Sequence, residues 1–200
     1  GYKLFTTPFG NPPFEGIGKM GTGDFYPYMF ENGAVYNHGA NLFYSRALAK
    51  VGDYKTLYRA VNYALPYNQK FHPEFTSYLP SYAMTNCYNL TPAFNGRGGL
   101  SFLTGSIAMV ERTVYSWMFG LDYHIENLTL SPCIPVQYKD AVVLDHFVEN
   151  EIKVIYHGYG NKIVSCLVNG TNFEPVKGKV VISKKLLNKD TVIEVTLENK

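Results

Sequence analysis

The sequence predicts an α+β protein with helices in its first part and a small antiparallel β-sandwich in its second part. Three observations lead to this fold class. Two helical segments, separated by one glycine, lie between residues 37 and 65, and a third amphipathic helix follows a glycine-rich loop near residue 104. After Leu121 the pattern changes to short alternating segments divided by tight turns, which is typical of antiparallel strands.

The first two helices are expected to form an antiparallel hairpin. One helix covers about residues 37–51, because Gly52 then supplies a C-cap, and Asp53 caps a second helix that ends before Pro66. Such a hairpin is the repeating unit of helical barrels and solenoids. Three or four helices separated by long loops cannot bury their apolar stripes against each other, so we expect part of a larger toroid. Gly1 opens the sequence in mid-pattern, which indicates a piece of a longer protein.

The third helix is predicted by apolar residues at helical spacing, and Gly120 is expected to end it. Between the helices, residues 1–33 are rich in Gly and Pro and predict an ordered irregular loop, and residues 81–87 predict a short helix. The apolar residues of the third helix are Ile107, Val110, Val114 and Trp117, with Met118 beside the last.

The start of this third helix is a candidate anion site. Thr104 is a plausible N-cap, which leaves the first-turn amides of Gly105 and Ser106 for an anion that the helix dipole also attracts. Arg97, in the glycine-rich loop, adds a forked donor for a phosphate or a carboxylate. The plainer interpretation is a capped core helix, and from this stretch alone that interpretation is favoured.

The strands are expected at a regular spacing, and the domain boundary precedes them. We assign residues 1–125 to the helical domain and residues 126–200 to the β-sandwich. The expected strands cover residues 141–148, 151–157, 162–168, 179–183 and 191–197, after a first segment at residues 128–132.

Composition limits the class of function. The chain has 200 residues, 46% of them apolar and 17% charged, with a net charge of +2, so a globular protein is expected and a nucleic-acid partner is not. The three cysteines lie far apart, which argues against a disulfide framework and a metal site and favours a reducing, cytoplasmic location. No apolar run reaches the length of a membrane span. The many tyrosines are a mild indication of a sugar-binding cleft.

Four segments carry recognisable motifs in a fixed order. Residues 31–38 read E-N-G-A-V-Y-N-H, residues 103–106 read L-T-G-S, residues 118–121 read M-F-G-L, and residues 128–135 read L-T-L-S-P-C-I-P. In this order they resemble E-N-G-G-x-F/Y-x-H, L-T-G-T/S, I-L-G-I and L-x-I-D-P-C-I-P of the glycoside phosphorylases of family 94, which include cellobiose and chitobiose phosphorylases. The resemblance implies the C-terminal part of an (α/α)6 barrel followed by a small β-sandwich.

The resemblance also implies an activity, which is the reversible phosphorolysis of a β-linked disaccharide with inversion. One carboxylic acid protonates the leaving oxygen while inorganic phosphate attacks the anomeric carbon, so phosphate replaces the water of an inverting hydrolase. Phosphate is then a substrate, and no cofactor or metal is expected. The family's catalytic acid lies upstream of this sequence, so no catalytic residue is assigned here and the chain alone is expected to be inactive.

The resemblance assigns ligands to particular residues. His38, Thr104 and Gly105 would bind phosphate, whereas the role of Arg97 follows only from its charge and position. Tyr82 and Asn86 fall where the family has E-P-Y-x-x-x-Q along the sugar site, but here the segment reads P-S-Y-A-M-T-N and lacks the Glu. Met109 stands in place of the family's aromatic residue in T-G-T-A-x-W. Both departures leave the identity of the sugar open.

Two other functions stay open. One is a glycoside hydrolase that uses two carboxylates, and the other is a non-catalytic carbohydrate-binding module. The module would expose aromatic platforms on the sandwich, for which the candidates are Phe147, Tyr156, Tyr159 and Phe173. A homodimer of the full-length protein is compatible with the resemblance, although no interface signal is readable in the sequence.

Overall fold

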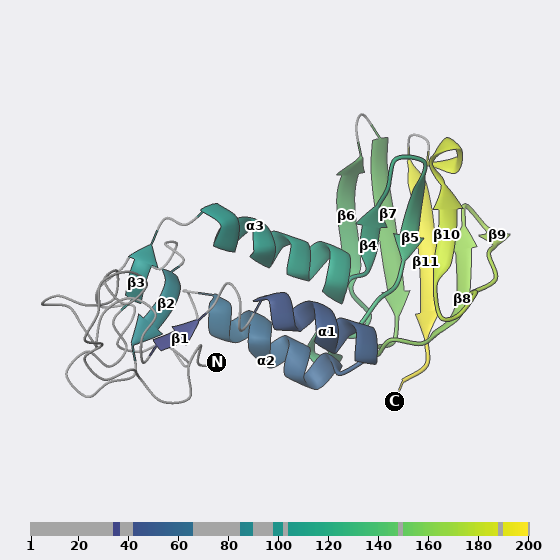
Figure 1. Cartoon of the computed structure of the whole chain (residues 1–200). Coiled ribbons are helices and arrows are strands. Elements are labelled where there is room, and N and C mark those ends of the chain that lie inside the picture. Colours follow the sequence, from purple (N-terminus) through teal and green to yellow (C-terminus); the bar gives the residue numbers. More distant parts are fainter. Residues whose placement is uncertain are drawn as a thin grey trace, which may run out of the picture. The chain divides into compact units, whose positions relative to one another are not determined.

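A computed structural model shows the chain as three α-helices and three β-sheets within the described residues (Figure 1). The chain divides into two compact units, Gly1–Ser45 with Arg59–Glu111, and Arg46–Tyr58 with Arg112–Lys200. The described residues are 34–36, 42–65, 85–89, 98–101, 104–147, 150–187 and 190–199.

The first unit contains a small antiparallel sheet in the order β1-β2-β3. Its strands are β1 (Ala34–Tyr36), β2 (Thr85–Asn89) and β3 (Gly98–Ser101). The helix expected at residues 81–87 is therefore wrong from Thr85 onward. Cys87 pairs with Tyr36 on one side and Gly99 on the other, so ladders to both neighbours hold this segment extended.

The helical hairpin consists of α1 (Tyr44–Val51) and α2 (Tyr54–Ala64). Both predicted caps are confirmed. Gly52 has φ +76°, and the Asp53 carboxylate accepts a 3.0 Å hydrogen bond from the amide of Thr56 in the first turn of α2. Residues 37–41, which the sequence assigned to the first helix, lie outside the described residues.

The third helix changes its winding along its length. It begins as α3 (Thr104–Arg112) and continues as a π-helix at Thr113–Met118. In a π-helix the hydrogen bonds join residues five apart, so Thr113 and Met118 face the same side, and both are buried.

The second unit contains two sheets. A three-stranded antiparallel sheet has the order β10-β5-β4, and a five-stranded sheet has the order β6-β7-β11-β8-β9. Strands β7 and β11 pair in parallel, whereas the other neighbours are antiparallel. The strands are β4 (Leu121–Tyr123), β5 (Asn127–Leu130), β6 (Val142–Phe147), β7 (Asn150–His157), β8 (Ile163–Val168), β9 (Thr171–Asn172), β10 (Val180–Ser183) and β11 (Thr191–Leu197). Short 3₁₀ turns lie at Val136–Tyr138 and Lys184–Leu186.

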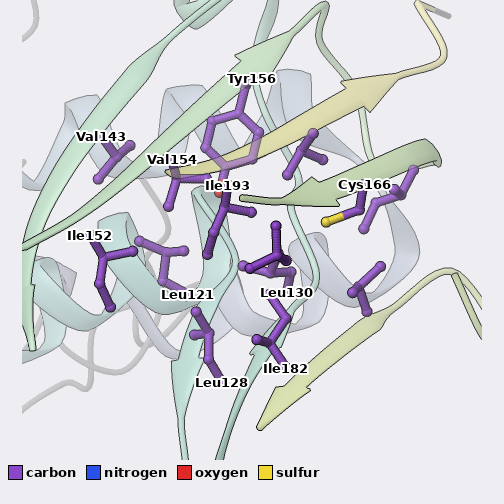
Figure 2. Packing of buried hydrophobic residues seen from close by; sticks show 14 of the residues in the cluster. Leu121, Leu128, Leu130, Val143, Ile152, Val154, Tyr156, Cys166, Ile182 and Ile193 are labelled. Atoms are coloured by element: carbon purple, nitrogen blue, oxygen red, sulfur yellow. The ribbon is translucent and has the colours of Figure 1, made fainter. Parts of the chain in front are cut away.

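One hydrophobic core lies between these two sheets (Figure 2). Burial alternates along the strands, as a strand with one face on a core requires: Thr191, Ile193, Val195 and Leu197 of β11 are buried, and the residues between them are partly exposed. Leu128, Leu130 and Ile182 from the smaller sheet meet Val154 and Ile193 from the larger one in the same cluster.

The predicted fold class is wrong. The described residues form no ring of paired helices and are not part of an (α/α)6 barrel, and the larger sheet is mixed rather than antiparallel. The tip of the hairpin instead packs within the strand-rich unit. Tyr54 meets Tyr159 and Tyr58 meets Tyr138, with ring centroids 5.8 and 6.0 Å apart. Residues 125 and 126, where we divided the domains, lie in the turn between β4 and β5.

Candidate functional site

The small sheet of the first unit pairs three segments that carry predicted site residues. Strand β1 runs toward the end of the sheet at which β2 begins with Thr85 and β3 ends with Ser101, and its last residue, Tyr36, pairs with Cys87, two residues short of Thr85. In the sequence, His38 follows Tyr36 by two residues, and Thr104 follows Ser101 by three. This end of the sheet is therefore the part of the described fold to which the predicted phosphate segments converge.

The predicted site residues differ in how far the structure describes them. Asn86 lies in β2 and Thr104 begins α3, both with their backbone alone described, and Gly105 is exposed in the first turn of α3. His38, Tyr82 and Arg97 lie outside the described residues. Arg97 directly precedes β3, whose first residue Gly98 pairs with Tyr88 toward the opposite end of the sheet from Ser101.

The start of α3 has the properties of an anion site in its backbone. The helix has nine residues and no acidic residue in its first turn, so the positive end of its dipole is not neutralised by a neighbouring side chain of that turn. It already includes Thr104, so the N-cap falls one position earlier than we expected. Gly105 has no side chain to cover the first-turn amides.

The apolar pattern of this helix is only partly confirmed. Ile107 is 52% exposed, although its spacing predicted a core residue. Met109 and Val110 pack against the small buried cluster of Leu42 and Ala64. The change from α to π winding after Arg112 ends the spacing on which the prediction depended.

The C-terminal end of the helix is fixed to the strands by the segment L-T-L-S-P-C-I-P. Gly120 has φ +75°, which confirms it as the terminating glycine, and a Cβ there would overlap backbone atoms of Ser131 and Pro132. The amide of Cys133 donates to the Met118 carbonyl and the amide of Ser131 to the Gly120 carbonyl, each at 2.9 Å. Two of the four resemblance segments therefore contact each other directly.

Buried polar side chains complete this junction. The Tyr156 hydroxyl donates a 2.5 Å hydrogen bond to the Phe119 carbonyl, and burial raises the pKa of Tyr156 well above its ordinary value. Burial, with a smaller contribution from the Asp53 carboxylate, raises the pKa of the Cys133 thiol to about 12. Burial alone raises the pKa of Cys166 to about 11. Protonated, buried thiols are poor nucleophiles, so these two cysteines are structural.

Two shallow hollows lie beside the β4–β5 turn, and a smaller one lies at one end of β6 and β7. The first two measure about 660 and 610 Å³ and share Ile125, Glu126, Asn127 and Lys184. The third measures about 230 Å³ and is lined by Leu144, Asp145, His146, Glu151, Ile152, Lys153, Asp190, Thr191 and Val192. None of the three includes a residue that the sequence predicted for phosphate or sugar.

One polar pair, which sequence reasoning missed, joins the edges of the two sheets. The Tyr123 hydroxyl on β4 donates a 2.8 Å hydrogen bond to the Asp145 carboxylate on β6. Burial and then the Asp145 carboxylate raise the pKa of Tyr123 well above its ordinary value, so the phenol stays protonated and is not a base. The two residues are 22 positions apart and their strands belong to different sheets, so no local pattern indicates the pair.

The described sandwich shows no row of aromatic sugar platforms. Tyr156 is completely buried, and Tyr159 and Phe173 pack against the core as partly buried side chains. The side chain of Phe147 lies outside the described residues. Among the described residues, no group of His, Cys, Asp and Glu is arranged to hold a metal ion. The helices of the described part of the chain also lack the length and apolar character that a membrane span requires.

No protein-family model and no curated protein matches this chain. The resemblance to glycoside phosphorylases therefore rests on the four sequence segments.

Proposed function

We propose that this chain supplies the phosphate-binding side of an inverting glycoside phosphorylase, which converts a β-linked disaccharide and inorganic phosphate into a sugar 1-phosphate and a free sugar. The observation that supports this proposal most directly is the register of the β1-β2-β3 sheet. Strand β1 runs toward His38 in the same direction in which β3 runs toward Thr104, and both lead to the end of the sheet where β2, the strand of Asn86, begins.

Chain connectivity limits how far His38 can lie from the last residue of β1. Two residues of extended chain span at most about 7 Å, so His38 stays near the end of β1. Two residues, Phe102 and Leu103, separate the end of β3 from Thr104. An imidazole and a helix N-terminus within such reach of one sheet end form a donor set suited to a phosphate dianion. Arg97 approaches from the other end, so we give it a lesser role than the sequence alone indicated.

In the proposed reaction these residues hold phosphate in the attacking position. Amides at the start of α3 donate hydrogen bonds to phosphate oxygens without any reorganisation, because the helix fixes their direction. His38 adds a further donor when its imidazole carries a proton at the bonding nitrogen. Tyr82 and Asn86 would contact sugar hydroxyls. The proposal assigns no catalytic acid to this chain, so the protonation of the leaving oxygen depends on residues outside it.

A cytoplasmic location belongs to the same proposal. Phosphorolysis uses inorganic phosphate and yields a charged sugar phosphate, and free cysteines such as Cys133 and Cys166 are typical of reducing compartments. The proposed ligands are inorganic phosphate and a disaccharide. No nucleic acid, membrane or cofactor is part of the proposal.

Phosphate-dependent thermal stabilisation tests the assignment of the site. We expect phosphate to raise the melting temperature of the chain, and we expect His38→Ala and Thr104→Ala to remove most of that increase, since only a ligand that binds the folded state stabilises it. His146→Ala and Thr171→Ala change the same residue types at exposed positions in the second unit and should leave the increase intact. An equal increase in all five proteins would refute the assignment.

A second measurement separates phosphorolysis from hydrolysis. A protein that contains this chain together with the missing acid should release a sugar 1-phosphate only when phosphate is present. A hydrolase, in contrast, should release the same amount of free sugar with or without phosphate. The described sandwich offers no particular support for the carbohydrate-binding alternative, because Tyr156 is buried and Tyr159 packs edge-on against Tyr54.

A further inference from the structure

Strand β6 is an edge strand whose outer backbone groups pair with no other strand in the described part of the chain. The Ala141 carbonyl accepts a hydrogen bond from the Tyr156 amide, and antiparallel bonding repeats every second residue. Val143 and Asp145 therefore bond to β7, whereas Val142 and Leu144 direct their N–H and C=O groups away from it. The sheet order has no strand on that side of β6.

The side chains along this edge are apolar and exposed. Val142 is 53% and Leu144 is 69% exposed, whereas Val143 between them is 8% exposed and faces the core. Figure 1 shows β6 at the margin of the sheet beside β7. Exposed apolar side chains next to unpaired backbone groups make a surface onto which another strand can add.

The usual devices that protect an edge strand are confined to one end of β6. Its segment V-V-L-D-H-F contains no Pro and no Lys, and its register with β7 has no bulge. Asp145 accepts a 2.9 Å hydrogen bond from the outward amide of His146, which blocks the strand at that point. Val142 and Leu144 have no such cap.

We propose that β6 is a self-association edge, at which two copies of this chain pair their β6 strands antiparallel about a two-fold axis at Val143. This register pairs Val142 of each copy with Leu144 of the other and forms about four backbone hydrogen bonds. It avoids the blocked amide of His146, whereas a register centred on Leu144 would need it.

The edge is complementary to itself in polarity as well as in hydrogen bonding. The two apolar residues of one copy meet the two of the other on the outer face of the sheet, which buries side chains that are more than half exposed in the monomer. Asp140 lies two residues before Val142, and His146 lies two residues after Leu144. The two-fold axis therefore brings Asp140 of one copy toward His146 of the second copy. A contact of this size is small, so we expect a dissociation constant of about 0.1–1 mM.

Sedimentation of the full 200-residue chain, from about 10 µM to about 1 mM, tests the proposal together with two variants at one position. Leu144→Lys adds charge to an exposed side chain, and Leu144→Pro removes an outward N–H without removing a hydrogen bond to β7, which edge strands tolerate. Both should raise the dissociation constant at least tenfold. Val181→Lys changes another exposed apolar residue, 57% exposed on the other sheet, and should dimerise like the unchanged chain.

Hydrogen exchange then locates the contact on the strand. The amides of Val142 and Leu144 should exchange more slowly at high than at low protein concentration, while the amide of Val143, bonded to β7, is protected at both. A chain that stays monomeric at 1 mM overturns the proposal. So does a dimer that Leu144→Lys leaves unchanged, or an edge that binds a foreign strand but not a second copy.

Discussion

The hydroxyl of Tyr156, on β7, donates a hydrogen bond to the carbonyl of Phe119, at the end of the third helix. The last carbonyls of a helix lack partners within the helix and must find them elsewhere when they are buried. Here a strand side chain supplies one partner, and the Cys133 amide supplies another by donating to Met118. The junction between helix and strands is thus a set of helix-end hydrogen bonds, and its strength is open to measurement.

Tyr156→Phe should reduce the free energy of unfolding by about 1–3 kcal/mol. The ring is retained, but the Phe119 carbonyl loses the donor that the fully buried Tyr156 supplies. Urea denaturation measures the difference. Tyr159→Phe is the control, because its half-buried hydroxyl has no comparable bond within the described residues. A loss below about 0.5 kcal/mol for Tyr156→Phe would show that this hydrogen bond contributes little.

Gly120→Ala should be much more costly than the same change at Gly178. Both glycines have φ +75°, so each alanine pays the strain of a left-handed backbone, about 1–2 kcal/mol. At Gly120 the new Cβ also overlaps the backbone at Ser131 and Pro132, whereas at Gly178 nothing lies within 4 Å. We expect a total loss of about 3 kcal/mol or more for Gly120→Ala. Equal losses in parallel urea titrations would contradict the close approach of these segments.

Much of the local structure was predictable, because local residues determine it. The β11 strand matches its predicted bounds of residues 191–197, and the Gly52–Asp53 turn between α1 and α2 was identified from capping preferences alone. Strand β8 differs from its prediction by one residue. In each case the alternation of apolar residues or the chemistry of one cap decides the conformation.

The parts that were not predictable depend on distant residues. The parallel pairing of β7 with β11 joins segments about 40 residues apart, and nothing in either strand specifies its direction. The π-helix at Thr113–Met118 departs from the 3.6-residue spacing of an α-helix, and the prediction of the third helix was based on that spacing. Of the candidate site, the helix start was located to within one residue, but the sheet that gathers β1, β2 and β3 was not foreseen.

Cys133 and Cys166 should resist alkylation in the folded chain at pH 9. Burial raises their pKa values to about 12 and 11, so the native state holds the thiols protonated while an unfolded thiol ionises near pH 8.5. Peptide mapping after iodoacetamide treatment should find both unmodified, and both modified in urea. Rapid labelling of either thiol in the folded chain would mean that it is accessible.

The raised pKa values of Cys133 and Cys166 also make the free energy of unfolding depend on pH. Between about pH 9 and 11 the native state binds more protons at these thiols than the unfolded state, so the free energy of unfolding should fall as pH rises. Cys133→Ala should make that fall shallower without reversing it, because Cys166 and the buried tyrosines still contribute. An unchanged slope for Cys133→Ala would indicate that its pKa is ordinary.

The most direct test of the phosphate site changes Gly105, because the two expected effects have opposite signs. Gly105→Asp should raise the melting temperature without phosphate. A carboxylate in the first turn of α3 interacts favourably with the helix dipole and stabilises the helix by about 0.3–1 kcal/mol. It should also abolish the stabilisation by phosphate, because the carboxylate occupies the position of the anion and repels the anion electrostatically. Gly105→Ala is the matched control without charge. We predict a phosphate-dependent increase in melting temperature for the unchanged chain that is absent in Gly105→Asp; the same increase in both proteins would contradict a phosphate site at the start of α3.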